Sequence, residues 1–173
     1  MNFHDKETTK KGDIGEQLVR DCLVGSGIIP YMPLAPFAHP FDILCATRDK
    51  QKIFVVEVKT KEARKYYPDT GINVSHYKTY KFVIGKYKIP VWIFFVDATN
   101  KAIYGNTLTE LEKPELVNGK QYPLIQKQII FFPLSHTKKI VELSDEQCES
   151  IKAHNTKNYS GAWQYPTEAT NGK

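Results

Sequence analysis

The sequence predicts an α/β fold, in which helices form a sandwich around a central mixed β-sheet. Segments with helical and with strand-like periodicity alternate along the chain in the order α-β-β-β-α-β-β-β-α. One segment, from Val91 to Val96, is apolar throughout, which is typical of a strand that is buried on both faces. The chain of 173 residues, with 41% hydrophobic and 25% charged residues, is long enough to bury a core of its own.

The first helix is expected to begin at Lys11, where apolar residues start to recur at helical spacing, and to end at the Gly-Ser-Gly sequence 25–27. The polar residues before it are expected to be frayed. An extended segment follows at 28–33. Pro36 and Pro40 then keep the backbone extended and exclude a helix from the link that comes next.

Two segments with strand composition, 41–47 and 53–61, predict an antiparallel hairpin, because the polar residues 48–52 between them are typical of a turn. The residues at 66–74 are expected to form a loop. A helix is expected from Ser75, its N-cap residue, to about Tyr87. Its predicted apolar stripe consists of Tyr77, Tyr80, Ile84 and Tyr87.

In the second half of the chain, the apolar strand is followed by a turn and by a short strand at 102–105. A helical turn is expected at 108–112, and a further strand at 128–134. Ser144 and Gln147 have the spacing of a capping box, which predicts a helix that ends near His154.

One domain is expected over residues 1–155, followed by a flexible tail at 156–173 that lacks periodicity. The sequence contains no uninterrupted run of about 18 apolar residues, which a membrane-spanning helix would need. The polar N-terminus is not typical of a secretion signal. The three cysteines are far apart, which argues against a disulfide framework or a zinc site and favours a reducing cytoplasm. The histidines form no metal-binding pair, so any metal would be bound by oxygen atoms. The cysteines are Cys22, Cys45 and Cys148.

Positive charge is concentrated in the middle of the chain. The whole chain has a net charge of +5, while the segment from Lys59 to Lys88 alone has eight basic and two acidic residues. A concentrated basic segment attracts polyanions, above all nucleic acids. The alternative interpretation is a solvated lysine surface. Within this segment Lys61, Arg64 and Lys65 follow the second hairpin strand and are candidates for contact with phosphates.

The pattern with the most chemical information is Glu57-Val58-Lys59 in the second hairpin strand, together with Asp42 in the first. Side chains alternate between the faces of a strand, so Glu57 and Lys59 point to the same side, about 7 Å apart. The hairpin brings Asp42 close to them at one edge of the sheet. The alternative is a half-exposed strand in which Glu57 only pairs with Lys59 and Lys61. A Glu-x-Lys triplet occurs about once by chance in this composition, so the flanking strands support the interpretation.

Two stretches of the chain resemble a known family. Phe41-Asp42-Ile43, followed by the strand at 54–60, resembles the PD-(D/E)XK nuclease superfamily. Residues 11–16, in which a glycine precedes a helical glutamate by four positions, are similar to the first helix of its archaeal Holliday-junction-resolvase branch. The resemblance covers residues 11–98 and departs from the motif where Phe41 separates the proline from the aspartate. It implies a restriction-endonuclease-like α/β/α sandwich with a central mixed β-sheet.

The resemblance also implies a Mg²⁺-dependent endonuclease that hydrolyses phosphodiester bonds in DNA, of the structure-specific type that acts on branched or repair intermediates. Asp42 and Glu57 are hard oxygen ligands that suit Mg²⁺, and the carbonyl oxygen of Val58 is implied as a further ligand. Glu16 would complete the metal site or bind a second ion. Lys59 would orient the attacking water or stabilise negative charge in the transition state. The implied catalytic residues are Glu16, Asp42, Glu57 and Lys59, and Mn²⁺ is expected to substitute for Mg²⁺.

Glu16 and the activity as a whole have alternatives. Glu16 could be an exposed helix residue, and Asp13, on a neighbouring face, could take its place. The chain could also be a catalytically inactive nucleic-acid-binding or protein-interaction module that retains the nuclease fold. The acidic residues together with Lys59 favour the enzyme. DNA is the expected partner, a homodimer would allow both strands to be cut, and neither a membrane nor an organic cofactor is expected.

Overall fold

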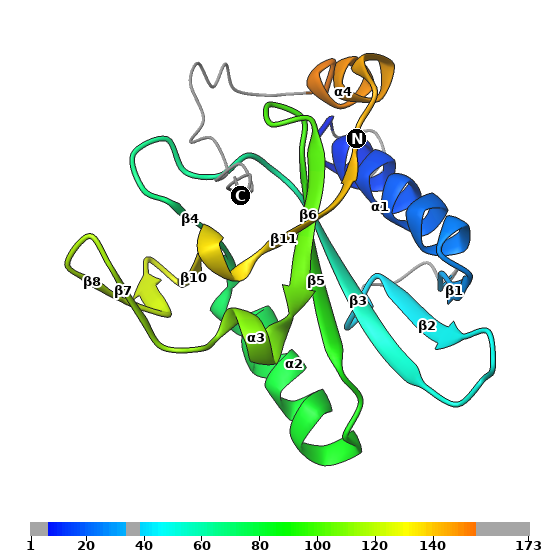
Figure 1. The fold of residues 1–173 in the computed structure, drawn as a ribbon, viewed down its shortest axis with the longest axis horizontal. Coiled ribbons are helices and arrows are strands. Elements are labelled where there is room, and N and C mark those ends of the chain that lie inside the picture. The colour runs from blue at the N-terminus through cyan, green and yellow to red at the C-terminus, as the bar shows by residue number, and fades with distance from the viewer. Residues whose placement is uncertain (1–6, 34–38, 155–173) are drawn as a thin grey trace, which may run out of the picture.

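The computed structural model describes residues 7–33 and 39–154. At its centre is a six-stranded sheet with the order β1-β2-β3-β5-β6-β11, and helices cover both faces (Figure 1). The strands of this sheet are β1 (Ile28–Tyr31), β2 (Ile43–Thr47), β3 (Ile53–Thr60), β5 (Val91–Asp97), β6 (Ala102–Thr107) and β11 (Lys138–Glu142). The helices are α1 (Glu7–Gly25), α2 (Val74–Tyr87), α3 (Leu108–Leu111) and α4 (Asp145–Lys152). The predicted tail at 156–173 lies outside the described residues, so the division into a domain and a tail stays a prediction.

The central sheet is mixed, as the sequence predicts. The expected hairpin is confirmed, because β2 and β3 are antiparallel with Ile43 opposite Val56. β3 pairs in parallel with β5, with Glu57 opposite Ile93, and the other neighbours are antiparallel. The connection from β3 to β5 passes through α2, which therefore begins near the C-terminal end of β3.

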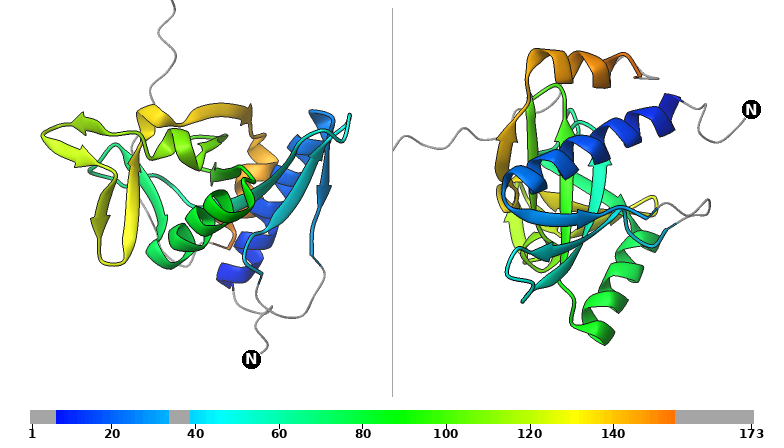
Figure 2. Two further views of the ribbon diagram at one scale, coloured as in Figure 1. Left: turned by 90° about the horizontal axis from the view of Figure 1, so that it is seen from below. Right: turned by 90° about the vertical axis from the view of Figure 1, so that its right-hand side faces the viewer.

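Two apolar layers hold the helices against this sheet. On one face, α1 and α4 lie side by side and pack against Val56 and Val58 of β3 (Figures 1 and 2). On the other face, α2 and α3 pack against Val55 of the same strand. Every residue of β5 except Trp92 is buried, which confirms the prediction of a strand covered on both faces. The helical residues in the second layer are Tyr80, Val83, Leu108 and Leu111.

A second, smaller sheet lies away from α1 and has the order β4-β10-β9, with the hairpin β7–β8 beside it (Figure 1). Its members are β4 (Asp69–Asn73), β9 (Leu124–Gln126) and β10 (Ile129–Pro133), and the hairpin consists of β7 (Glu115–Val117) and β8 (Lys120–Tyr122). The strand predicted at 128–134 is confirmed as β10, but the loop predicted at 66–74 is wrong, because it contains β4. Only glycine fits at position 71 of this strand, where a Cβ atom would lie 2.2 Å from the carbonyl oxygen of Ile130.

The ends of the helices differ in how well the sequence predicts them. The capping box of α4 is confirmed, since the Ser144 side chain accepts the Gln147 N–H and the Gln147 side chain accepts the Ser144 N–H. α1 begins at Glu7, before the expected start. The N-cap residue of α2 is Asn73, not Ser75. The apolar stripe of α2 is also partly wrong, because Tyr87 is 55% exposed while Val83 is buried.

Two further observations concern the class of protein. The three cysteines are free thiols. Among the helices that the structure describes, none is both long and apolar enough to cross a membrane.

Candidate active site

Asp42 lies directly before β2, beside the C-terminal half of β3. Its backbone N–H donates to the carbonyl oxygen of Val56 at 3.1 Å, and its carboxylate oxygen Oδ2 accepts the N–H of Val58 at 2.6 Å. These two bonds fix the carboxylate at the edge of the sheet. The pKa of Asp42 is raised to about 7, first by burial and then by the negative charge of Glu57, while the Val58 N–H opposes the shift.

Glu57 points toward the α2 face of β3 and is 2% exposed. Its neighbours Val56 and Val58 pack on the α1 face, so the alternation expected along the strand is confirmed. The Glu57 oxygen Oε1 contacts Nζ of Lys59 and lies 3.2 Å from Nδ1 of His76. A carboxylate that is buried this deeply requires such partners.

Lys59 is more accessible than the carboxylate that it contacts. Its side chain is 27% exposed, compared with 3% for the side chain of Glu57. The ammonium group therefore places a positive charge on the outer side of the site, where an anion can approach. An ammonium group in such a position can shift from a carboxylate to a phosphate oxygen, because its long stem is flexible.

Glu16 reaches the same region from α1, which crosses the end of β3. The crossing is close, since a Cβ atom added to Gly15 would lie 1.8 Å from Oγ1 of Thr60. The pKa of Glu16 is raised, mainly by burial and further by the charges of Asp13 and Glu57. Glu16 in turn raises the pKa of Asp42. Asp13, the alternative to Glu16, is exposed.

The carboxylates of Glu16, Asp42 and Glu57 thus act on one another, and each would be stabilised by a cation between them. These oxygen ligands fit Mg²⁺, which needs few protein carboxylates because it keeps several waters. Within residues 7–33 and 39–154, no three acidic, histidine or cysteine side chains are arranged so that they could hold a metal ion together.

His76 is a member of the site that the sequence analysis missed. It lies in the first turn of α2, where Nδ1 faces Glu57 and lies 3.5 Å from the hydroxyl oxygen of Tyr80. The pKa of Tyr80 is raised by burial and by the charge of Glu57. One feature of the sequence could have indicated that His76 faces the protein. His76 lies four residues before Tyr80 on the same helix, and Tyr80 belongs to the predicted buried stripe. His76 and Thr79 also line a cavity of about 350 Å³ together with His39.

The three cations that follow β3 differ in their surroundings. Nζ of Lys61 donates to the carbonyl oxygen of Gly71, and burial lowers the pKa of Lys61 to about 8. Arg64 forms two bonds of 2.5 Å with the carboxylate of Asp69, which is fully buried. Lys65 is exposed. Two of the three predicted phosphate contacts therefore have partners inside the protein, and Lys65 is the one whose charge is open to solvent.

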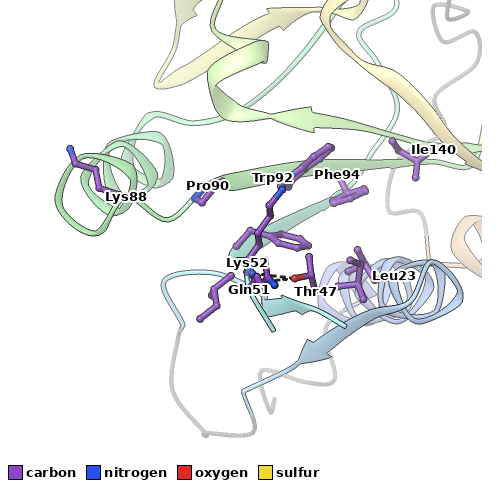
Figure 3. A pocket seen from close by; sticks show the side chains of 12 residues that line it. Leu23, Thr47, Gln51, Lys52, Lys88, Pro90, Trp92, Phe94 and Ile140 are labelled. Carbon is purple, nitrogen blue, oxygen red and sulfur yellow. Dashed lines mark hydrogen bonds between the residues drawn. The ribbon is translucent and has the colours of Figure 1, made fainter. Parts of the chain in front are cut away.

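A cavity lies at the other end of the sheet, where β3 and β5 begin (Figure 3). Its volume is about 620 Å³. Phe54 and Trp92 are among the aromatic residues that line it, and Lys52 and Lys88 contribute the positive charges. None of the residues that line it in the described part of the chain is acidic. The described lining of this groove therefore lacks the carboxylates that lie at the end of β3.

No family model matches the chain, and no curated protein is significantly similar to it. Among solved structures, the chain is similar to that of Archaeoglobus fulgidus Hjc, a Holliday junction resolvase from an archaeal hyperthermophile. The two are 12% identical with a TM-score of 0.53, and the match covers 79% of this chain and 99% of that one. The similarity confirms the restriction-endonuclease-like fold that the sequence resemblance implies.

Proposed function

We propose that the chain is a metal-dependent endonuclease that hydrolyses phosphodiester bonds in DNA at the C-terminal end of β3. The observation that supports this most is that the charge of Glu57 helps to raise the pKa of both Glu16 and Asp42, next to the accessible ammonium group of Lys59. Perturbed acids beside a cation are typical of a catalytic site. The fold supports the same conclusion, since it is that of a Holliday junction resolvase.

Mg²⁺ would be held by Asp42, Glu57 and the carbonyl oxygen of Val58, with Mn²⁺ as a substitute. Glu16 would complete this site or hold a second ion. When bound, the metal supplies positive charge that screens the scissile phosphate and acidifies a water. No organic cofactor is needed for this chemistry.

The side chains of the protein have distinct roles in this proposal. Lys59 stabilises the negative charge that develops on the phosphate, because its ammonium group is the accessible cation of the site. His76 orients the Glu57 carboxylate from α2. The Val58 N–H donates to the Asp42 carboxylate and so holds it in place beside β3, the strand that carries Glu57.

The substrate that we propose is branched DNA or a repair intermediate. The described residues contain no separate sequence-reading domain, which favours recognition of DNA structure over sequence. Lys65 is the best placed of the three predicted cations for phosphate contact. Lys61 and Arg64 instead form hydrogen bonds with groups inside the protein. We further propose action as a homodimer in the cytoplasm, to which the free cysteines are suited.

A second candidate is an inactive binding module with the same fold. The observation that favours it is the contact of Glu57 with both Lys59 and His76, which already balances the buried charge without a metal. The two candidates differ in turnover, because only the enzyme cleaves DNA when Mg²⁺ is supplied.

The experiment that tests the proposal uses plasmid, linear, nicked and branched DNA, each with Mg²⁺, Mn²⁺ or EDTA. The wild-type protein is compared with Glu57→Gln, which keeps the shape of the side chain and removes its charge. Cleavage by the wild type with either metal, fastest on branched DNA and absent in EDTA and in Glu57→Gln, supports the endonuclease. Absence of cleavage in every metal arm would contradict it and favour the binding module, whereas equal cleavage by Glu57→Gln would contradict the assignment of the site.

A further inference from the structure

A positively charged surface, here called the basic arm, lies next to the loop that leaves β3. It brings together that loop, strand β8 and the turn between β9 and β10, and β8 lies on the side of the molecule away from α1 in Figure 1. Its residues are Arg64, Lys65, Tyr66, Tyr67, Lys120 and Lys127.

The basic arm is joined firmly to the loop by buried polar contacts. Asp69 accepts two bonds from Arg64 and one, at 2.6 Å, from the hydroxyl of Tyr122, the last residue of β8. Nη1 of Arg64 also donates to the side chain of Gln126 in β9 at 3.1 Å. The three segments are therefore held together around one buried carboxylate, and the arm has a fixed position relative to the strand that carries Lys59.

Stacking of cations on Tyr67 adds to this order. Nζ of Lys120 lies 3.5 Å from the centroid of the Tyr67 ring, and the guanidinium carbon of Arg64 lies 4.4 Å from it. These cation–π contacts orient Lys120 without neutralising its charge. The arm thus displays a cation from β8 at a defined place beside the loop.

The outer side of the arm carries positive charge. In the part of the chain that the structure describes, Lys65, Lys120 and Lys127 form no ion pair with a carboxylate. By contrast, Lys101 and Lys113 each pair with one at 2.5 and 2.6 Å. Unpaired ammonium groups at a surface are suited to bind phosphates, because each contact releases a counterion from the nucleic acid.

An exposed aromatic side chain accompanies these cations. Tyr66 is 76% exposed, and Nζ of Lys65 lies 5.4 Å from the centroid of its ring. An aromatic ring that remains in solvent next to a lysine can stack on an unpaired base while the lysine binds the adjacent phosphate. No packing within the described residues accounts for so exposed a ring.

The distance from the site limits what the arm can contact. Lys65 follows Lys59 by six residues, and a chain of that length spans at most about 20 Å. The rise of duplex DNA is about 3.4 Å per base pair, so this span corresponds to about six base pairs. A duplex whose scissile phosphate lies at Lys59 can therefore extend to the arm.

We propose that the basic arm is a second nucleic-acid-binding surface: Lys65, Lys120 and Lys127 bind phosphates, Lys65 within about six base pairs of the cleaved bond, and Tyr66 stacks on an unpaired base beside it. The inference rests on the proposed endonuclease function and extends it, because it adds Lys120, Lys127 and Tyr66 to the substrate contacts. It also assigns to the arm a preference for DNA in which a duplex adjoins unpaired bases.

The test compares two triple variants that have the same net charge. One replaces Lys65, Lys120 and Lys127 by Gln in the arm. The matched control replaces three exposed lysines of α2 and its C-terminal end by Gln, namely Lys78, Lys86 and Lys88. Binding to a labelled duplex of about 25 base pairs is measured over a range of salt concentrations, with Ca²⁺ in place of Mg²⁺ so that the probe remains intact.

The arm variant is expected to reduce the slope of log K against log[salt] by roughly two to three units, since each lost phosphate contact accounts for about 0.9. The control variant is expected to retain the slope of the wild type. Tyr66→Ala is expected to weaken binding of a duplex with a single-stranded overhang by roughly 5- to 150-fold, and that of the blunt duplex much less. Tyr66→Phe keeps the ring and is expected to behave as the wild type.

The outcomes separate the arm from the active site. If the wild type cleaves DNA but both triple variants have the same slope, the arm is wrongly assigned and the endonuclease stands. If the arm variant alone loses slope but the wild type cleaves nothing, the endonuclease fails and the binding surface stands. Equal effects of Tyr66→Ala on the overhang and on the blunt duplex would overturn the stacking role. A wild-type protein that binds neither probe would overturn both proposals.

Discussion

The two ends of the central sheet bury different kinds of groups. At the C-terminal end of β3, Glu57 contacts Lys59 and His76, and the pKa of Asp42 is raised to about 7 by burial and by the charge of Glu57. At the other end a cavity of about 620 Å³ is lined mainly by apolar side chains. The site that we propose lies apart from this cavity, because charges that disturb one another are typical of a catalytic site.

The difference also has an energetic side. Apolar residues such as Phe54 and Trp92 can line a groove without a partner, because scattered apolar surface is tolerated. Buried carboxylates cannot, since each needs a hydrogen bond, a cation or a proton. Glu57 contacts Lys59 and His76. Asp42 accepts a hydrogen bond from a single N–H, and it keeps its proton to an unusually high pH because its pKa is raised. The acidic end of the sheet is thus the part that a divalent cation would stabilise.

Removal of a carboxylate at the acidic end is expected to have the largest effect. Asp42→Ala and Glu57→Ala should each reduce the single-turnover rate of DNA cleavage by about 10³-fold or more, because the site loses a metal ligand. The double variant should lose little more, since the two residues act as one unit. Lys52→Gln, at the groove, is the control and should cleave at the wild-type rate. Wild-type cleavage by folded Glu57→Ala would show that the site is misassigned.

The metal-free protein should become less stable as the pH rises. The folded state keeps the Asp42 proton up to about pH 7, while the unfolded chain, with a pKa near 3.8, releases it earlier. The stabilisation from this proton is therefore complete below the lower value and is lost as the pH rises through the higher one. The loss should be on the order of 4 kcal/mol, because one pKa unit corresponds to about 1.4 kcal/mol.

Urea unfolding of the wild type and of Asp42→Asn, from about pH 4 to pH 8 in EDTA, measures this contribution. The difference between the two proteins isolates Asp42 from the other titrating groups. If the difference in the free energy of unfolding is the same at both ends of this range, Asp42 does not have a raised pKa.

Glu16→Gln should have an intermediate effect, because Glu16 lies at the margin of the acidic end. Loss of this carboxylate is expected to weaken Mg²⁺ binding and cleavage by roughly 10- to 100-fold. The stability of the metal-free protein should stay the same or rise, since the substitution removes repulsion with Asp42 and Glu57. Asp13→Asn on the same helix is the matched control. Should Asp13→Asn have the larger effect, Asp13 is the true member of the site.

The smallest effect should come from the backbone of α1. Gly15→Ala places a methyl group against Thr60 and is expected to lower the free energy of unfolding by roughly 1–3 kcal/mol and to reduce cleavage by shifting Glu16. Gly12→Ala, three residues earlier, meets nothing within 4 Å and should stabilise α1 by up to about 1 kcal/mol. Thermal unfolding of both variants checks this, and equal stability would mean that α1 does not approach β3 so closely.

The same comparison shows which parts of the structure the sequence can predict. The hairpin and the shared face of Glu57 and Lys59 follow from the two-residue period of a strand. β11 could not be predicted in this way, because all five of its residues are exposed and show no alternation. β4 escaped prediction because its short sequence, with Gly71 at its centre, is typical of a turn.

Long-range contacts account for what was missed in the candidate site. His76 reaches Glu57 across 19 positions of sequence, through the packing of α2 on the sheet. Arg64 belongs to a run of basic residues in the sequence, yet it pairs with Asp69, which was predicted to lie in a loop. No local pattern contains either partnership, because both depend on the way in which separate elements pack.

The most direct test of the acidic end as a metal site is a calorimetric titration with Mg²⁺ at about pH 6, in two buffers that differ in ionisation enthalpy. Asp42, with a pKa of about 7, is mainly protonated there, so binding to the wild type should release nearly one proton. Asp42→Asn should bind far more weakly and release none, while Lys52→Gln should match the wild type. Equal affinity and equal proton release in the wild type and Asp42→Asn would contradict the account.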